Sequence, residues 1–232
     1  MSQFDESDIR NEADREGESF LEENKKCFNP ELHDGSAFLE LAGNARDDRY
    51  QLLAEMRDRV RLSIVAGFFH DWEKNLRQWL VDEMQRSPLQ IGDSTRHAIW
   101  NINLCSKGGD LFELLESFGW ELKAASYFAD LNAGRLVVNV YKHGDGHSLE
   151  SLSRYYPKFL KHPLGGLCEW TEEKWSHRHL YITDGDLDAF SDAVLDFWAN
   201  VPESVFNSQI TDPPNWLMKA LERDSNKKDQ SK

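Results

Sequence analysis

The feature that most constrains the fold is an apolar repeat between about Asp47 and Arg86. Large apolar residues recur there every three or four positions, which is the period of one face of an α-helix. They are Leu53, Met56, Val60, Ile64, Phe68, Trp72, Leu76 and Leu80. Asp47 or Asp48 can cap the start of this helix, and Ser87-Pro88 stops it. A helix of this length predicts either a long helical arm or a kink near Gly67.

The rest of the chain reads as shorter helices between turn residues. Caps, glycine stops and apolar spacing predict helices at 36–45, 97–105, 111–120, 121–142, 148–156, 186–201 and 215–223. Residues 177–184 (HRHLYITD) are the one segment that favours a short β-strand. We therefore predict a predominantly all-α protein, a helical bundle with a long helical arm and at most one short β segment. The expected organisation is an acidic, partly disordered N-terminal segment at 1–26, a single helical domain at 27–223 and a disordered tail at 224–232.

Composition limits the classes of function. The net charge is −14, whereas a protein that coats DNA is usually basic because it must neutralise phosphates. Residues 1–24 carry nine acidic and two basic side chains, but residues 135–162 carry five basic and two acidic ones. A nucleic-acid role would have to use that local basic stretch, unless the stretch is only a solvated surface patch.

The cysteines and the apolar runs predict a compartment. Cys27, Cys105 and Cys168 are far apart in sequence and odd in number, which argues against a disulfide framework. The acidic start of the chain does not have the pattern of a signal peptide, and no run reaches the length of a membrane helix. We expect a cytoplasmic protein that does not enter a membrane.

Residues 135–148 (RLVVNVYKHGDGHS) are the segment that favours chemistry. Arg135, Asn139 and His143 are spaced by four residues, so a helix places them on one stripe. A guanidinium binds phosphate through two N–H groups, an imidazole exchanges protons near neutral pH, and an amide orients either of them. These are the parts needed for metal-free cleavage of RNA, in which a base takes the 2′-OH proton and a cation stabilises the charged phosphorus intermediate.

Asn139-x-x-x-His143 on a late helix of an all-helical protein resembles the HEPN superfamily, whose motif is Arg, a polar residue that is often Asn, and then His. In this chain Val138 precedes Asn139, and the nearest upstream arginine is Arg135. The resemblance covers about residues 47–160. It implies a helical bundle that acts on or binds RNA in bacterial defence or toxin–antitoxin systems, and a homodimer in which two motifs face one cleft.

The full predicted site extends this stripe. His70 and Glu73, which share a face of the long helix with Arg77, would support His143, and Lys142, Lys158 and Lys161 would follow the RNA backbone. No cofactor and no metal are expected. The structural alternative is that His143 only closes its helix while Arg135 and Asn139 make structural hydrogen bonds.

Two other functions stay open. The main alternative is a non-catalytic protein–protein interaction module, in which the long helix binds a partner and the acidic N-terminal segment engages a basic one. A third is a metal-dependent hydrolase built on scattered histidines, such as His177-x-His179 on the possible strand. A metal-independent endoribonuclease is the enzyme that the residues favour.

Overall fold

The computed structural model describes residues 5–29, 34–86, 91–105, 110–161, 174–201 and 211–230. Over these residues the protein is all-α, as predicted, with α-helices, short 3₁₀-helices and no strand. It divides into two compact units, residues 1–64 and 65–232. The boundary falls inside α2 (Gly35–Arg86), the longest of the described helices. The single helical domain at 27–223 stays a prediction.

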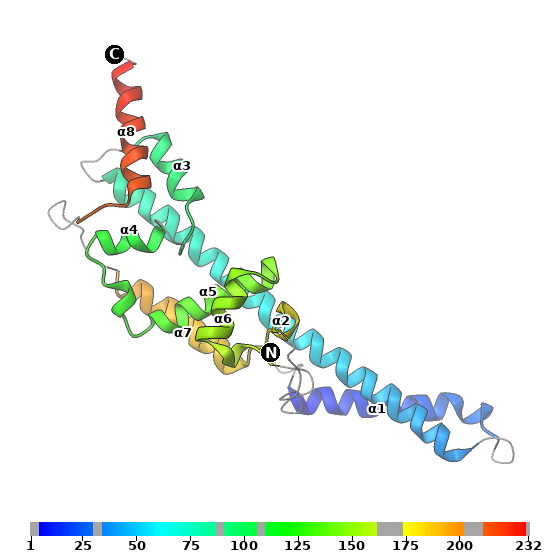
Figure 1. The fold of residues 1–232 in the computed structure, drawn as a ribbon. Coiled ribbons are helices and arrows are strands. Elements are labelled where there is room, and N and C mark those ends of the chain that lie inside the picture. The colour runs from blue at the N-terminus through cyan, green and yellow to red at the C-terminus, as the bar shows by residue number, and fades with distance from the viewer. Residues whose placement is uncertain are drawn as a thin grey trace. The chain divides into compact units, whose positions relative to one another are not determined.

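The first unit is an antiparallel pair of helices, α1 (Glu6–Asn24) and the start of α2 (Figure 1). The short η2 (Lys25–Cys27) follows α1. Ile9, Ala13 and Gly17 form the buried stripe of α1 at a spacing of four residues. A Cβ added at Gly17 would lie 3.3 Å from the carbonyl oxygen of Ala42, so glycine permits a close approach of the two helices.

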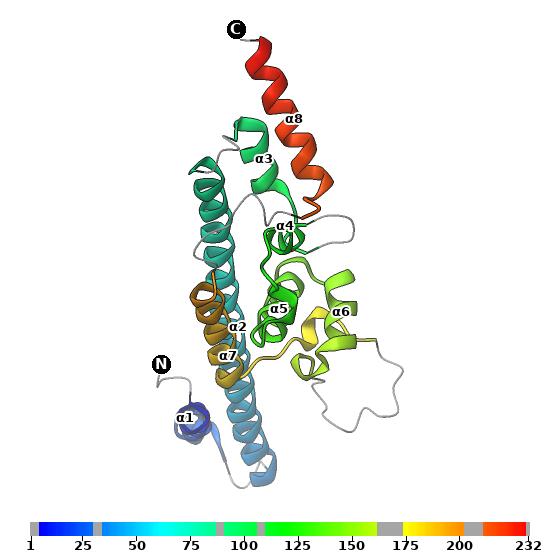
Figure 2. The same cartoon turned by 90° about the vertical axis from the view of Figure 1, so that its left-hand side faces the viewer.

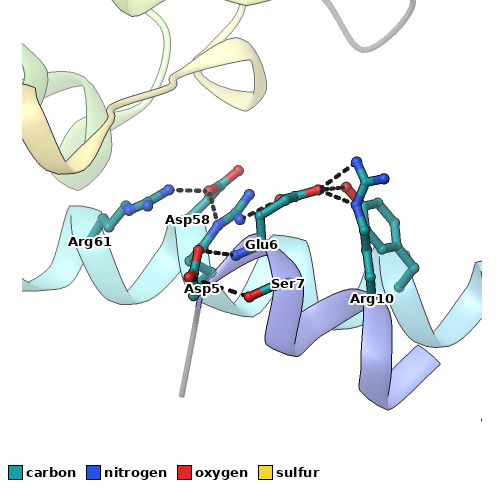
Figure 3. A network of polar contacts seen from close by, with 8 residues as sticks. Asp5, Glu6, Ser7, Arg10, Asp58 and Arg61 are labelled. Atoms are coloured by element: carbon teal, nitrogen blue, oxygen red, sulfur yellow. Dashed lines mark hydrogen bonds and ion pairs between the residues drawn. The ribbon is translucent and has the colours of Figure 1, made fainter. Parts of the chain in front are cut away.

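Ionic contacts hold the beginning of α1 on α2. The Asp5 carboxylate caps α1 by accepting from the backbone N–H of Glu6. The Glu6 carboxylate accepts from the Tyr50 hydroxyl at 2.5 Å and from the Arg57 guanidinium at 2.8 Å. Figure 3 shows Asp5 and Glu6 at the start of α1 beside Asp58 of α2. The acidic segment predicted to be partly disordered is therefore helical from Glu6, because its carboxylates find cationic and hydroxyl partners on α2.

The second unit surrounds one aromatic core. Its elements are the rest of α2, α3 (Asp93–Asn101), α4 (Leu111–Ser117), η3 (Leu122–Ala124), α5 (Phe128–His143), α6 (His147–Tyr155), η4 (Pro157–Phe159), η6 (His177–His179), α7 (Asp184–Ala199) and α8 (Asn215–Gln230). Figure 2 shows α3 beside α8, and α5 packs on both α6 and α7. The ring of Trp72 contacts those of Phe69, Phe112 and Phe197 in the centre.

Helix α5 approaches this core closely at Gly134. A Cβ at Gly134 would overlap the ring of Phe69 and come within 3.2 Å of Phe190. The residues of α5 that point inward, including Leu131, Val137 and Val140, are fully buried. Arg135, the first residue of the predicted site, directly follows Gly134. The close contact at Gly134 therefore helps to position Arg135.

Several predicted elements differ in detail. The helices expected at 36–45 and 47–86 are one helix, and the apolar stripe is buried only from Trp72 onward. Met56 is 45% exposed, and Val60 and Ile64 are also exposed, since α1 packs on a different face, through Tyr50 and Arg57.

Two further segments depart from the predictions. The strand expected at 177–184 is a 3₁₀-turn, because the Ser176 side chain accepts from the backbone of Arg178 while the Ser176 N–H donates to the His179 ring. One isolated antiparallel bridge, between Leu160 and Leu180, is the only pairing there among the described residues. Helix α8 continues to Gln230, beyond the start of the predicted disordered tail.

Helix α8 is tied to α3 by a buried carboxylate. Asp224 accepts from the backbone N–H groups of Gly92, Ser94 and Thr95 at 2.8–3.0 Å and from the Thr95 hydroxyl at 2.7 Å. It therefore caps the start of α3 from another helix. Burial alone would raise the pKa of Asp224, but the Thr95 hydroxyl and these N–H groups hold it at about 2. None of the described helices is long and apolar enough to span a bilayer.

Candidate functional site

A cavity of about 250 Å³ lies within the second unit. One wall is a face of α5 and another is a face of α2, and the segment 103–105 closes a side. The side chains that line it are Phe69, His70, Glu73, Arg77, Asn103, Leu104, Cys105, Arg135, Val138, Asn139, Lys142 and His143. The lining on each helix repeats every three or four residues, so each wall is a single helical face.

The α5 wall holds the predicted stripe. Arg135 and Asn139 are partly buried and His143 is exposed, so the stripe runs from the interior of the cavity to its rim. His143 is the last residue of α5 and Gly144 ends the helix with a positive φ of 73°. That conformation favours glycine, which explains why the helix stops directly after the histidine.

Arg135 is oriented by an amide rather than by a carboxylate. Its Nε and Nη2 both donate to Asn132 Oδ1, at 3.1 and 2.7 Å, and Asn132 in turn donates to the Tyr156 hydroxyl at 3.2 Å. No ion pair of Arg135 occurs within the described ranges. Burial lowers the pKa of the Arg135 guanidinium, because the attraction of Cys105, Asp110 and Tyr156 does not offset its loss of hydration.

The α2 wall contains a second arginine with the opposite arrangement. Arg77 is only 6% exposed, and its Nε donates to the Glu73 carboxylate at 3.0 Å. It also donates to the carbonyl oxygens of Ile99 and Ile102 at the end of α3. The charge of Arg77 is therefore neutralised and its position is fixed. Among the described residues Glu73 pairs with Arg77 and makes no hydrogen bond to His143.

The charge balance of the cavity follows from this difference. Three cationic side chains, Arg77, Arg135 and Lys142, line it against the single carboxylate of Glu73. A protein with a net charge of −14 thus has a cavity with excess positive charge and two imidazoles. Such a site fits a small anionic group such as phosphate, because a guanidinium binds carboxylate and phosphate oxygens through two N–H groups.

The predicted site residues fall into two groups. The cavity brings together Arg135, Asn139, His143, Lys142, His70 and Glu73. Lys158 and Lys161 are not among the lining residues. The Lys158 ammonium pairs with Asp186 at 3.3 Å, and Lys161 lies over the ring of Tyr181. The basic stretch 135–162 therefore does not form one surface around the cavity.

The segment 103–105 was not anticipated from the sequence. It is irregular, so no periodicity marked Asn103 or Cys105 as lining residues. Partial burial of the sulfur raises the pKa of the Cys105 thiol, which disfavours the thiolate that nucleophilic attack requires. Cys168 lies outside the described residues, and Cys27 and Cys105 are free thiols.

The histidines proposed for a metal site are engaged otherwise. His177 hydrogen-bonds Asp145 through both its backbone N–H and its ring, and His179 accepts from the backbone of Ser176. In the part of the chain that the structure describes, no cluster of three or more His, Cys, Asp or Glu side chains is arranged to hold a metal ion.

Comparison with known proteins adds no relative. No family model, no curated protein and no solved structure matches the chain. The HEPN resemblance thus rests on Asn139 and His143 alone, and the geometry of the cavity is the basis for any statement about function.

Proposed function

We propose that the second unit binds single-stranded RNA through this cavity and cleaves it without a metal ion, as a HEPN-like ribonuclease. Arg135 would hold the phosphate, Asn139 would orient the reacting groups, Lys142 would contact the RNA backbone at the rim, and His143 would transfer a proton. The observation that carries the proposal is Arg135, a partly buried guanidinium that faces a cavity without a carboxylate partner in the described structure.

The chemistry follows from the charge of the phosphate. A bound phosphodiester would supply the negative charge that Arg135 lacks, and the guanidinium would stabilise the additional charge that develops on phosphorus during attack by the 2′-OH. An imidazole at the rim of the same cavity can accept the proton of that hydroxyl. The 2′-OH requirement would make RNA, and not DNA, the substrate.

Binding of a fluorescent single-stranded oligoribonucleotide tests this assignment. Arg135→Ala and Lys142→Ala should each weaken binding and should each lower the slope of log K against log salt by about 0.7, one phosphate contact. Lys161→Ala is the matched control, because Lys161 lies outside the cavity, and it should leave the slope unchanged. Equal binding by wild type and Arg135→Ala would contradict a phosphate site at Arg135.

A specific observation also supports the second function, a protein–protein interaction module. Leu52, Met56, Val60 and Ile64 are exposed on α2 in the first unit, at a spacing of four residues. A row of exposed apolar side chains is typical of surfaces that bind other proteins. The two proposals concern different units and do not exclude each other.

A homodimer and a role in bacterial defence are further proposals, drawn from the HEPN resemblance. Light scattering at tens of micromolar measures the first directly. A monomer at that concentration would contradict the dimer but not the cavity.

A further inference from the structure

The cavity contains a second imidazole besides His143. His70 lies on α2 and His143 ends α5, so the two rings come from different walls of one cavity. Both side chains are exposed to solvent at this cavity, which leaves them accessible to a ligand. The Arg135 guanidinium, which has no carboxylate partner among the described residues, lines the same cavity.

Cleavage of RNA by its own 2′-OH requires two proton transfers. The 2′-oxygen loses its proton to a base and forms a bond to phosphorus, and the bond between phosphorus and the 5′-oxygen breaks. The 5′-oxygen must then receive a proton from an acid. The products are a 2′,3′-cyclic phosphate and a 5′-hydroxyl, and no other reactant is consumed. Two imidazoles, one on each side of the phosphate, can make one of these transfers each.

We propose that His70 is this second catalytic residue, the acid that protonates the 5′-oxygen, while His143 is the base. The proposal rests on the proposed ribonuclease function. It makes one chain sufficient for the reaction, whereas the HEPN resemblance implies a cleft shared between two chains.

The other polar side chains of the cavity do not fit the role of the acid. The Glu73 carboxylate accepts from Arg77 and forms an ion pair with it, so it is not a proton donor. Guanidinium and ammonium groups, which Arg77, Arg135 and Lys142 carry, are much weaker acids than an imidazolium. Burial raises the pKa of the Cys105 thiol and makes it a weaker acid. Imidazole is the side chain whose ordinary proton affinity lies near neutrality.

The test compares two substrates that differ in the leaving group. A dinucleotide needs a proton on its departing 5′-oxygen, whereas uridine 3′-(4-nitrophenyl phosphate) releases a stable nitrophenolate. His70→Ala should lower cleavage of the dinucleotide by about 10²- to 10⁴-fold and leave cleavage of the nitrophenyl ester near the wild-type rate. His143→Ala should lose both activities. His97→Ala removes an exposed histidine outside the cavity and should change neither.

The other outcomes distinguish a failure of the role of His70 from a failure of the ribonuclease function. Dinucleotide cleavage at the wild-type rate by His70→Ala, or loss of both activities, would overturn the role of His70 and leave the function of His143 intact. A wild-type protein that cleaves neither substrate would refute the proposed function itself. His70→Gln serves as a second variant, and melting temperatures verify that each variant is folded.

An equimolar mixture of His70→Ala and His143→Ala tests whether one chain is sufficient. Each chain then has an incomplete cavity, so we expect no recovery of dinucleotide cleavage. Recovery of a substantial fraction of the wild-type activity would show that the two histidines act across a dimer, and would overturn the proposal of a site within one chain.

Discussion

Asp224 offers a test of the architecture that supports the cavity, because it caps α3, whose last carbonyl groups hold Arg77. Asp224→Asn preserves the shape of the side chain but replaces one acceptor oxygen with an NH₂ group. At least one backbone N–H group that now donates to the Asp224 carboxylate would then face the NH₂ group of the asparagine, which is also a donor. We expect this substitution to destabilise the protein more than a typical surface change.

Two ways of valuing the same hydrogen bonds give the magnitude. The pKa of Asp224 falls from 3.8 to about 2 on folding, which corresponds to about 2 kcal/mol of stability at neutral pH. The loss of a charged hydrogen bond at a buried helix cap costs about 1.5–3 kcal/mol. Since Asp224 is only 6% exposed, solvent screening reduces these values little. The expected loss is about 2 kcal/mol.

The loss should also depend on pH with a defined sign. A carboxylate whose pKa is lowered by folding stabilises the native state above its unfolded pKa, and this contribution disappears as the pH falls through the folded pKa of about 2. The difference in stability between wild type and Asp224→Asn should therefore be full at pH 7 and shrink below about pH 4.

Urea unfolding at several pH values measures this difference. Asp93→Asn is the matched control, an exposed acid in the first turn of α3, and should change stability by less than about 0.5 kcal/mol. A difference for Asp224→Asn that equals the control, or that stays constant down to pH 2, would refute the cap.

Two further predictions concern packing and charge. Gly134→Ala should destabilise the protein by about 1–3 kcal/mol, because the added methyl group overlaps the ring of Phe69, whereas Gly67→Ala, with open space around it, should be neutral or stabilising in the same thermal melts. Equal effects of the two substitutions would contradict the close contact of α5. The Tyr50 hydroxyl and the Arg57 guanidinium lower the pKa of Glu6 from 4.5 to about 2, so α1 should stay attached at neutral pH and loosen as the pH falls toward 2. Glu6→Gln should show fast amide exchange at the start of α1 already at pH 7, and slow exchange in that variant would argue against the contact.

The helical period explains what the sequence could predict about the site. Residues four apart on a helix share a face, so Arg135, Asn139 and His143 were expected on one stripe, and they line one cavity. The same reasoning grouped His70 with Glu73. The role of these residues in catalysis stays a prediction, because the arrangement shows proximity and charge and not a reaction.

The remaining features depend on contacts between distant segments, which a local pattern does not contain. The apolar face of α2 was predicted as one stripe, but α1 packs on a different face, so Val60 and Ile64 are exposed. Lys158 belongs to the basic stretch by sequence, yet it forms an ion pair with Asp186 of α7. No feature of the sequence alone placed the irregular segment 103–105 against α5.

Cleavage of a single-stranded RNA in the presence of a metal chelator tests the central claim most directly. Wild-type protein should produce fragments with 2′,3′-cyclic phosphate ends. His143→Ala should bind the RNA with nearly the same affinity but cleave it about 10²- to 10⁴-fold more slowly. A wild-type protein that leaves the RNA intact, or a His143→Ala variant that cleaves as fast as wild type, would contradict the account.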